Sequence, residues 1–279
     1  MKKVFVKLLL IAVLFLPGSP LGPSADTLAQ VTPNHFDSGA REQNPDLSGI
    51  TIIRFLTSDD YPPFNYRNDS GELVGFNIDL AKAICENLQL GCTMQVWPWE
   101  QAADALEDFQ GDALIAGLAI NRENGARFDF SQIYMMFPGR FVTRKPDILN
   151  FDASNLAGKI IGSRKGSAHY EFISRYLPDT KQIAYDSEFD ALLALQKNEI
   201  FAYFGDGLRA SIWLNQNPGC CEFAGETYFN QNLFGQGLAI AFAPEQDQMR
   251  RVINYALFRL KREGVLDELY LRWFPVGFY

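Results

Sequence analysis

The chain has 279 residues, a formal net charge of −8 from 25 Lys and Arg against 33 Asp and Glu, and 47% hydrophobic residues. This hydrophobic content excludes a generally disordered chain, and the length accommodates one large domain or two ordinary ones. The acidic balance argues against broad nucleic-acid binding, which requires a basic surface. The chain has two histidines, His35 and His169, too few for a histidine-rich metal site.

The first 29 residues have the order of an export signal. A start with two lysines precedes an apolar run over 8–16, which a Pro-Gly pair ends, and small and polar residues lead to Ala25 and Ala29. A membrane-spanning helix needs about 20 apolar residues, so this run is too short to span. We expect a signal peptide over 1–29, cleaved after Ala25 or Ala29; an uncleaved anchor is the alternative. Polar residues over 30–49 predict a flexible tail.

Strand and helix patterns alternate along the rest of the chain. β-rich or continuous apolar runs predict strands at 51–56, 93–97, 113–120, 141–144, 159–163, 200–204 and 237–242. Helical spacing predicts helices beginning at a capping Asn77, and over 100–109, 167–176, 189–197, 246–262 and 265–273, the last two separated by Gly264. A hairpin turn is predicted over 68–71. This alternation indicates an α/β chain with largely parallel sheets, in two blocks that meet near residue 142.

Four cysteines allow three pairings. Cys85 lies near the end of a helical pattern and Cys92 at the start of a strand-like run, and a bridge between them would close a short loop worth roughly 2.5 kcal/mol in the chain-entropy model. Cys220 and Cys221 are adjacent, and either a vicinal disulfide or two thiols is compatible with the sequence. An exported chain favours oxidised cysteines.

Short motifs in a fixed order resemble those of one family. They are Tyr-Pro-Pro-Phe at 61–64, Gly-Glu-Leu-Val-Gly-Phe-Asn-Ile-Asp-Leu-Ala at 71–81, Gly-Asp-Ala at 111–113, Phe-Asp-Phe-Ser at 128–131, Gly-Lys-Ile-Ile-Gly at 158–162 and Leu-Lys-Arg-Glu-Gly-Val at 260–265. Together they resemble the family 3 extracellular solute-binding proteins, the polar amino acid receptors of ABC importers, over about 50–275. The spacing of Cys85 and Cys92 also matches a disulfide of the lysine/arginine/ornithine- and histidine-binding members.

This resemblance implies a type II periplasmic-binding-protein fold, with two α/β lobes joined by two hinge strands. Lobe 1 would span 50–137 and 238–279, lobe 2 would span 143–231, and the hinges would be 138–142 and 232–237. A small-molecule solute would bind between the lobes and close them. The implied protein is a periplasmic monomer that works with an ABC transporter permease and needs no cofactor, metal or nucleic acid.

The resemblance also implies ligand contacts. Tyr61 and Trp99 match two aromatic residues that hold the solute, and two such faces can sandwich an apolar or cationic side chain; each ring would otherwise be core. Asp206 matches the acid that binds the ammonium group of the ligand, a role that competes with capping a helix. Ala116 and Gly117 belong to a matching segment and are expected to line the cleft.

A second group of expected contacts follows a strand of the second block. Free N–H groups at Ser167 and Ala168 favour an anion such as a carboxylate. Arg164 and His169 match positions that line the cleft, and exposed surface is the alternative for both.

Two positions depart from the family pattern. Ala119 stands where the family has Thr or Ser, and Asn124 stands where it has the arginine that clamps a carboxylate, which asparagine cannot replace. Ser58 stands at an early acidic position, with Asp59 and Asp60 beside it. We therefore expect an amine-bearing, amino-acid-like solute that is anchored mainly by Asp206.

Two other functions remain as alternatives. One is an enzyme of the cyclohexadienyl dehydratase type, with Asp206 and His169 as acid and base. The other is a receptor for a sensor protein. The sequence contains no GxSxG and no paired-histidine motif, so we expect no catalytic residues and a binding protein.

Overall fold

The computed structural model describes residues 44–279. The expected signal peptide and residues 30–43 of the expected tail lie outside the described residues. Within the described chain, Leu47 and Ile50 pack against the first hydrophobic core, and Gln248 Nε2 donates to the carbonyl oxygen of Asp46 at 2.9 Å. Residues just before the expected start of the first lobe therefore already contact it.

The first sheet has five strands in the order β5-β1-β6-β13-β7. These are β1 (Ile52–Thr57), β5 (Gly91–Val96), β6 (Ala113–Leu114), β7 (Asp129–Phe130) and β13 (Ala241–Phe242). β1 is parallel to β5 and to β6, whereas β13 is antiparallel to both β6 and β7. The sheet is therefore mixed, with its parallel part in the first block as the alternation predicted.

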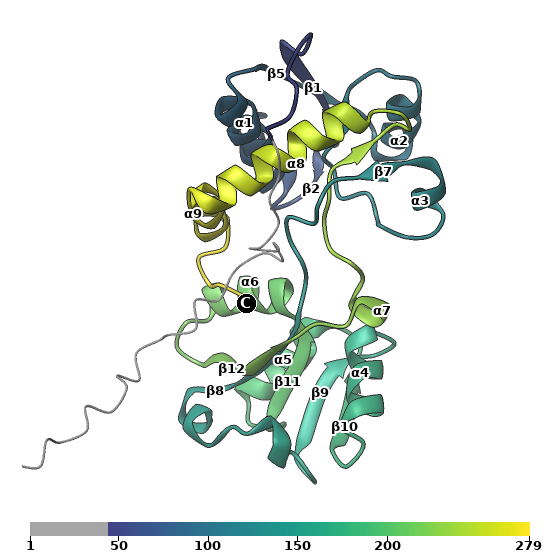
Figure 1. Cartoon of the computed structure of the whole chain (residues 1–279). Helices are drawn as coiled ribbons and strands as arrows, with labels where there is room; N and C mark the ends of the chain where they lie inside the picture. Colours follow the sequence, from purple (N-terminus) through teal and green to yellow (C-terminus); the bar gives the residue numbers. More distant parts are fainter. Residues whose placement is uncertain (1–43) are drawn as a thin grey trace, which may run out of the picture. The chain divides into compact units, whose positions relative to one another are not determined.

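Helices cover both faces of this sheet (Figure 1). α1 (Phe76–Leu88), α8 (Asp247–Arg262) and α9 (Val265–Trp273) contact one another on one face, and α2 (Trp99–Glu107) contacts β1 and β6. The alternation of β1 explains the two faces, because Ile53 and Phe55 belong to the core under α1 and α8, and Leu56 belongs to the core under α2. The short helix α3 (Asn124–Arg127) precedes β7.

The second sheet has five strands in the order β10-β9-β11-β8-β12. These are β8 (Gly139–Arg144), β9 (Ile160–Arg164), β10 (Lys181–Tyr185), β11 (Ala202–Asp206) and β12 (Cys221–Tyr228). β9 is parallel to β10 and β11, and β8 is antiparallel to β11 and β12. Two short 3₁₀ helices, η1 (Lys145–Asn150) and η2 (Ala153–Asn155), connect β8 to β9.

This second sheet also has a core on each face. Val142 and Tyr203, paired across β8 and β11, belong to the core with α5 (Glu188–Gln196) and α6 (Gly207–Gln216). Their neighbours Phe141 and Phe204 belong to the opposite core, with α4 (Ala168–Tyr176) and α7 (Gln231–Phe234). The period of two along each strand thus divides the large apolar side chains between the faces.

A small third sheet carries the loop after β1. It consists of β2 (Asp60–Tyr61), β3 (Asn65–Arg67) and β4 (Leu73–Val74) in the order β2-β3-β4. The predicted turn at 68–71 joins β3 to β4, and Asn68 Oδ1 accepts hydrogen bonds from the N–H groups of Ser70 and Glu72 at 3.0 and 2.9 Å. The predicted hairpin is confirmed.

Two predicted strands are shorter than the apolar runs that suggested them. Only Ala113–Leu114 of 113–120 and only Ala241–Phe242 of 237–242 are strands. Ile115 and Ile240 are fully buried without belonging to a strand. Continuous apolar character here reflects burial, which both strand and irregular backbone can provide.

Asn77 does not cap α1, contrary to our prediction. The cap position is Gly75, whose φ of 137° suits glycine, and a Cβ there would lie 2.0 Å from the carbonyl oxygen of Phe64. Asn77 is instead fully buried: its Nδ2 donates to Asn65 Oδ1 and its Oδ1 accepts from the Tyr134 hydroxyl, both at 2.8 Å. Its side chain therefore bonds to buried polar groups and not to the free N–H groups at the start of the helix.

The two expected hinge segments overlap β8 of the second sheet and the helix α7. Residues 139–142 are paired with β11 within β8, and α7 ends at Phe234. Next to these segments, Met135 and Leu238 form an antiparallel bridge. Tyr279 bonds to the chain just before the first segment, because its hydroxyl donates to the carbonyl oxygen of Met136 at 2.6 Å and accepts from the Met136 N–H at 3.0 Å.

Both cysteine pairs are bonded in the structure. Cys85 at the end of α1 is joined to Cys92 in β5, with their Cα atoms 5.9 Å apart. Cys220 is joined to its neighbour Cys221 at the start of β12. Among residues 44–279, none of the helices combines the length and the apolar character that crossing a membrane requires.

Candidate functional site

A pocket of about 330 Å³ lies where the strands of the first sheet end. Its lining comes from three segments that follow β1, β5 and β6, and consists of Ser58, Asp60, Tyr61, Trp99, Ala116 and Gly117. Parallel strands place such connections at one edge of a sheet, where α/β proteins commonly bind ligands. Four residues singled out in the sequence, Tyr61, Trp99, Ala116 and Gly117, therefore lie together.

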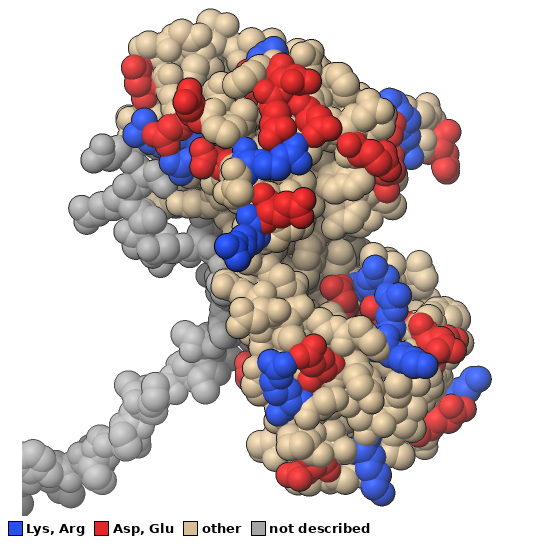
Figure 2. All heavy atoms as spheres, turned by 90° about the vertical axis from the view of Figure 1, so that its right-hand side faces the viewer, with Lys and Arg blue, Asp and Glu red and all other residues tan. Residues whose placement is uncertain are grey.

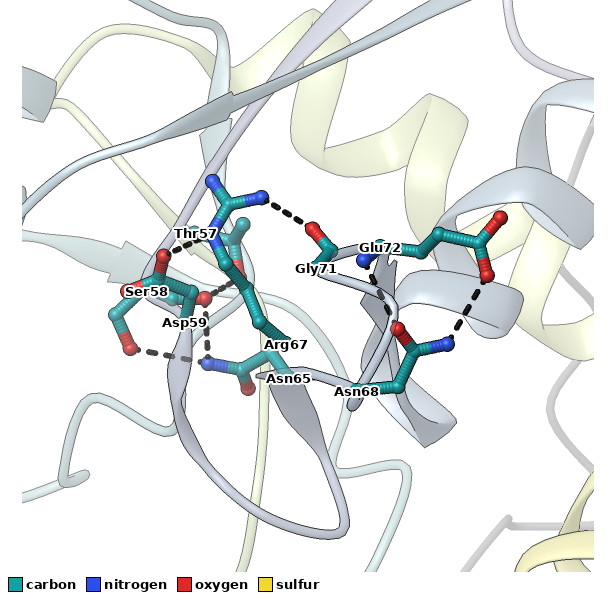
Figure 3. A network of polar contacts seen from close by, with 8 residues as sticks. All are labelled: Thr57, Ser58, Asp59, Asn65, Arg67, Asn68, Gly71 and Glu72. Atoms are coloured by element: carbon teal, nitrogen blue, oxygen red, sulfur yellow. Dashed lines mark hydrogen bonds and ion pairs between the residues drawn. The ribbon is translucent and has the colours of Figure 1, made fainter.

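A polar network holds the loop that leads into this pocket (Figure 3). Asp59 Oδ2 accepts from Arg67 Nε at 2.7 Å, and Arg67 Nη1 donates to the carbonyl oxygen of Gly71 at 2.9 Å. Asn65 Nδ2 donates to the carbonyl and hydroxyl oxygens of Ser58 at 3.1 and 3.0 Å. Asp59 is thus committed to Arg67, and the exposed Asp60 is the acid of this loop that lines the pocket.

The Tyr61 ring forms one wall of the pocket and rests on the first core. It stacks on buried Phe64, with ring centroids 4.9 Å apart and an interplanar angle of 27°. Burial raises the pKa of Tyr61, and the Asp206 carboxylate raises it further, while the Arg209 cation lowers it. The charges of Asp206 in β11 and Arg209 in α6 therefore act on the Tyr61 ring, which packs against the core of the first sheet.

Trp99 forms a second aromatic part of the lining. It is the first residue of α2, and it stays 40% exposed although it is a large apolar residue. A ring at the start of a helix, half open to solvent and lining a pocket, has a face available for a solute.

The two departures from the family pattern lie outside the pocket lining. Asn124 is the first residue of α3, and its Nδ2 donates to the carbonyl oxygen of Ala119 at 2.8 Å. Its amide is therefore used to close its own loop. The next arginine along, Arg127, is paired with Asp104 and Glu107 at 2.8 and 2.7 Å, so its guanidinium is already engaged.

Asp206 ends β11 and also caps α6. Its Oδ1 accepts from the Arg209 N–H at 2.8 Å, so the alternative role as a helix cap is realised. Burial raises the pKa of Asp206 above its usual range, and the nearby Glu188 carboxylate raises it further, while the Arg209 N–H and charge oppose them. A carboxylate held in such surroundings is stabilised by a cationic partner.

The strand-to-helix connection at β9 and α4 contains four expected contacts. Ser167 caps α4, since its Oγ accepts from the Tyr170 N–H at 3.1 Å and donates to the carbonyl oxygen of Arg164 at 2.8 Å. Ala168 is the first residue of the helix. Arg164 is exposed.

His169 lies in an aromatic cluster of the second sheet. It stacks on Phe234, with ring centroids 4.5 Å apart and planes 14° apart, and its Nε2 is buried without a hydrogen-bond partner among the described residues. Burial, with the Arg209 charge, lowers its pKa to about 4. His169 is therefore a neutral member of an aromatic cluster at neutral pH and not an exposed surface residue.

The sequence patterns did not indicate three of these charged residues, Asp60, Arg209 and Glu188. Asp59 pairs with Arg67, and Asp60 is the neighbouring acid that lines the pocket. No group of three or more His, Cys, Asp or Glu in residues 44–279 is arranged to hold a metal ion.

The chain belongs to the bacterial extracellular solute-binding proteins, family 3, whose family model matches residues 53–276. It is 32% identical over 228 residues to ABC transporter arginine-binding protein 1 of Escherichia coli (strain K12), covering 82% of this chain and 93% of that protein. The resemblance stated from the motifs is confirmed.

Two solved structures show the same fold at lower identity. The L-cystine solute receptor of Neisseria gonorrhoeae, in its unliganded open conformation, is 18% identical with a TM-score of 0.69, covering 81% of this chain and 94% of that one. An ancestral cyclohexadienyl dehydratase is 20% identical with a TM-score of 0.70, covering 84% and 98%. The predicted type II periplasmic-binding-protein fold is confirmed, and the protein is a solute-binding protein by family.

Proposed function

We propose that this protein is the periplasmic component of an ABC importer and that it captures a cationic, amine-bearing amino acid for delivery to a permease. The observation that carries this proposal is the pocket with two aromatic walls, Tyr61 and Trp99, and an acid, Asp60, at its rim. The relative named an ABC transporter arginine-binding protein supports the same class of solute.

The chemistry of the pocket suits a guanidinium or ammonium side chain. A cation over an aromatic face gains roughly 0.5–2 kcal/mol, depending on its desolvation. Asp60 would add a charge-assisted contact at the exposed rim. The second acid, Asp206, would bind the α-amino group, because its burial already disfavours an unpaired carboxylate.

The proposal includes the division of the chain given from the sequence. Lobe 1 is 50–137 with 238–279, lobe 2 is 143–231, and motion at the crossings near 138–142 and 232–237 would close the protein on its solute. Export by a cleaved signal, action as a monomer and independence of metal and cofactor belong to the same proposal.

We also propose binding without turnover. A dehydratase shares the fold, but at 20% identity this likeness concerns the fold alone. His169, with its pKa lowered to about 4, would be unprotonated at neutral pH and so a poor proton donor there. Mass spectrometry of the solute recovered after incubation should show it unchanged; a product that forms in proportion to the protein would support the enzyme alternative.

A thermal-shift series tests the class of solute. L-arginine, L-lysine, L-histidine, L-glutamate, L-leucine and agmatine would each be added to the purified protein at equal concentration. A ligand that binds only the folded state at 100 times its Kd stabilises that state by about 2.7 kcal/mol. We expect the cationic amino acids to give the largest shifts. A largest shift with glutamate or leucine would contradict the proposal.

Delivery to a permease and service to a sensor protein require a separate experiment. Radiolabelled solute uptake would be compared in cells with and without the gene for this protein. Loss of high-affinity uptake supports delivery to a permease. Normal uptake, with loss of a solute-dependent transcriptional or motility response, would support the sensor alternative.

A further inference from the structure

We propose that Arg209 binds the acid group of the solute and determines the specificity of the site for amino acids over plain amines. The first turn of α6 would then present both charges that recognise an amino acid, Asp206 for the amine and Arg209 for the acid. This inference rests on the proposed function, and it supplies the cation that position 124 does not provide.

Arg209 occupies a defined place in that turn. Asp206 caps the helix by accepting from the Arg209 N–H at 2.8 Å, so the two side chains begin three residues apart at one helix end. A single helical turn keeps such residues at a fixed spacing. One rigid element can therefore hold the anion and the cation at the separation that a small zwitterion needs.

Packing places this turn against the pocket side of the molecule. The N–H of Gly207 donates to the carbonyl oxygen of Pro138 at 2.8 Å. Leu208 is 9% exposed and belongs to the same core cluster as Phe64, against which Tyr61 also packs. The charges of both Asp206 and Arg209 shift the pKa of Tyr61, which agrees with this placement.

The Arg209 guanidinium has donors to offer. Its side chain is 61% exposed, and Nη1 donates to Glu188 Oε2 at 3.2 Å. A guanidinium has five N–H donors in a planar fork that suits a carboxylate, so this single bond leaves the fork largely available. Glu188 is 15% exposed and would orient the side chain.

Two other arginines near the first-sheet pocket are already engaged. Arg127 is held by two acids, and Arg67 by Asp59 and the carbonyl oxygen of Gly71. Arg122 is exposed and lies close to Ala119 in sequence, so it is the natural competitor and serves as the matched control. The charge of Arg209 shifts the pKa values of both Tyr61 and Asp206.

The test compares L-arginine with agmatine, which has the same guanidinium and amine but no carboxylate. Calorimetry would give the ratio of the agmatine Kd to the L-arginine Kd for the wild type, Arg209→Gln, Arg209→Lys, Arg122→Gln and Glu188→Gln. Retained agmatine binding and an unchanged unfolding temperature show that each variant is folded. The ratio isolates recognition of the acid group.

We expect Arg209→Gln to lower the ratio about tenfold or more, as the loss of a charge-assisted pair does. Arg209→Lys should lower it less, Arg122→Gln should leave it unchanged, and Glu188→Gln should raise it by removing the counter-ion of Arg209. An unchanged ratio in Arg209→Gln, or a drop with Arg122→Gln of the same size, overturns the inference. Wild-type protein that binds agmatine as tightly as L-arginine also overturns it.

The failure of the proposed function would look different. Wild-type protein that binds neither probe, but binds a neutral or acidic amino acid, would show that the solute class is wrong. The ratio for that amino acid and its decarboxylated amine would then be measured with the same variants, and Arg209→Gln would be expected to lower it in the same way.

Discussion

Gly117 and Tyr61 approach so closely that only glycine fits between the pocket floor and its aromatic wall. A Cβ on residue 117 would lie 2.8 Å from Cε1 of Tyr61, and φ at this glycine is +82°, a conformation that other residues rarely adopt. The position of the ring and the identity of residue 117 are therefore linked.

Gly117→Ala should displace Tyr61 and weaken binding of the cationic solute. The strained backbone alone costs about 1–3 kcal/mol of folding free energy. Gly125→Ala is the matched control, because a Cβ at Gly125 would meet nothing within 4 Å and φ there is not positive. Calorimetry would measure the affinity and thermal unfolding the stability of both variants. Equal affinities in the two variants would show that residue 117 does not shape the site.

Trp99→Ala should weaken binding by about 1 kcal/mol or more, because one aromatic wall would be lost. Leu271→Ala, at a residue that is 63% exposed on α9 outside the pocket, should leave the affinity unchanged. Small-angle scattering of the wild type with and without solute would report closure as a smaller radius of gyration. If Trp99→Ala binds the solute with wild-type affinity, the Trp99 ring does not contact the solute.

Asp206→Asn should cost about 2–5 kcal/mol of binding free energy, since it removes the partner of a desolvated cation. Asparagine is also a good helix cap, so the unfolding temperature should change little. Asp60→Asn, at an exposed rim, should cost under about 1 kcal/mol, and Asp59→Asn, which is committed to Arg67, less still. Equal losses in all three would mean that the effect is one of overall charge.

The affinity for a cationic solute should depend on pH through Asp206. Burial raises the pKa of this carboxyl in the free protein, and a bound cation favours its ionised form. Affinity should therefore be full above this raised pKa and fall as the pH drops through it. Calorimetry from pH 7.5 to 4.5 would show the loss of affinity, and Asp206→Asn should make the affinity nearly independent of pH. If the variant keeps the pH dependence of the wild type, another group than Asp206 causes it.

The stability of the protein should fall on acidification because of His169. Its pKa is lowered from 6.5 to about 4 by burial, so the unfolded chain binds more protons between these values. The stabilisation is thus present above about pH 6.5 and is lost as the pH falls toward 4, with a limit on the order of 3 kcal/mol. Denaturant midpoints measured across this pH range would show the loss, and His169→Phe should reduce the pH dependence of the free energy of unfolding.

The bond between Cys85 and Cys92 should be found in material from the periplasm. Peptide mapping without reductant should recover the two cysteines in one linked peptide. Replacing both by alanine should lower the free energy of unfolding by roughly 2.5 kcal/mol, from the entropy of the loop that the bond closes. Two free thiols in exported protein would contradict the expectation.

The fold was predictable where periodic segments had clear ends. The helices predicted at 246–262 and 265–273 match α8 and α9, since Gly264 takes a left-handed φ of 77° between them. By contrast, α6 was missed because Gly207–Gln216 opens with glycine and its apolar spacing is irregular. β10 was missed because none of its five residues is buried, so it has no apolar run or alternation, and it lies at a sheet edge.

The pocket was predictable in its aromatic and glycine residues and less so in its charges. Tyr61 and Gly117 lie in motifs that fix a turn and a close approach, which local sequence expresses. That Asp60 and not Asp59 lines the pocket could not be predicted, because Asp59, in the bend before β2, pairs with Arg67 at the end of β3. Surface charge also gives little guidance, because Figure 2 shows acidic and basic side chains interspersed on the face it presents.

The buried amides below the pocket form a one-way chain. The Tyr134 hydroxyl donates to Asn77, Asn77 donates to Asn65, and Asn65 donates to Ser58 in the pocket lining. All four residues are almost completely buried, so each amide has one usable orientation. An aspartate at position 65, which differs from asparagine by one group of the side chain, would set acceptor against acceptor at the carbonyl oxygen of Ser58. The shape of the pocket floor thus depends on the direction of donors that lie well beneath it.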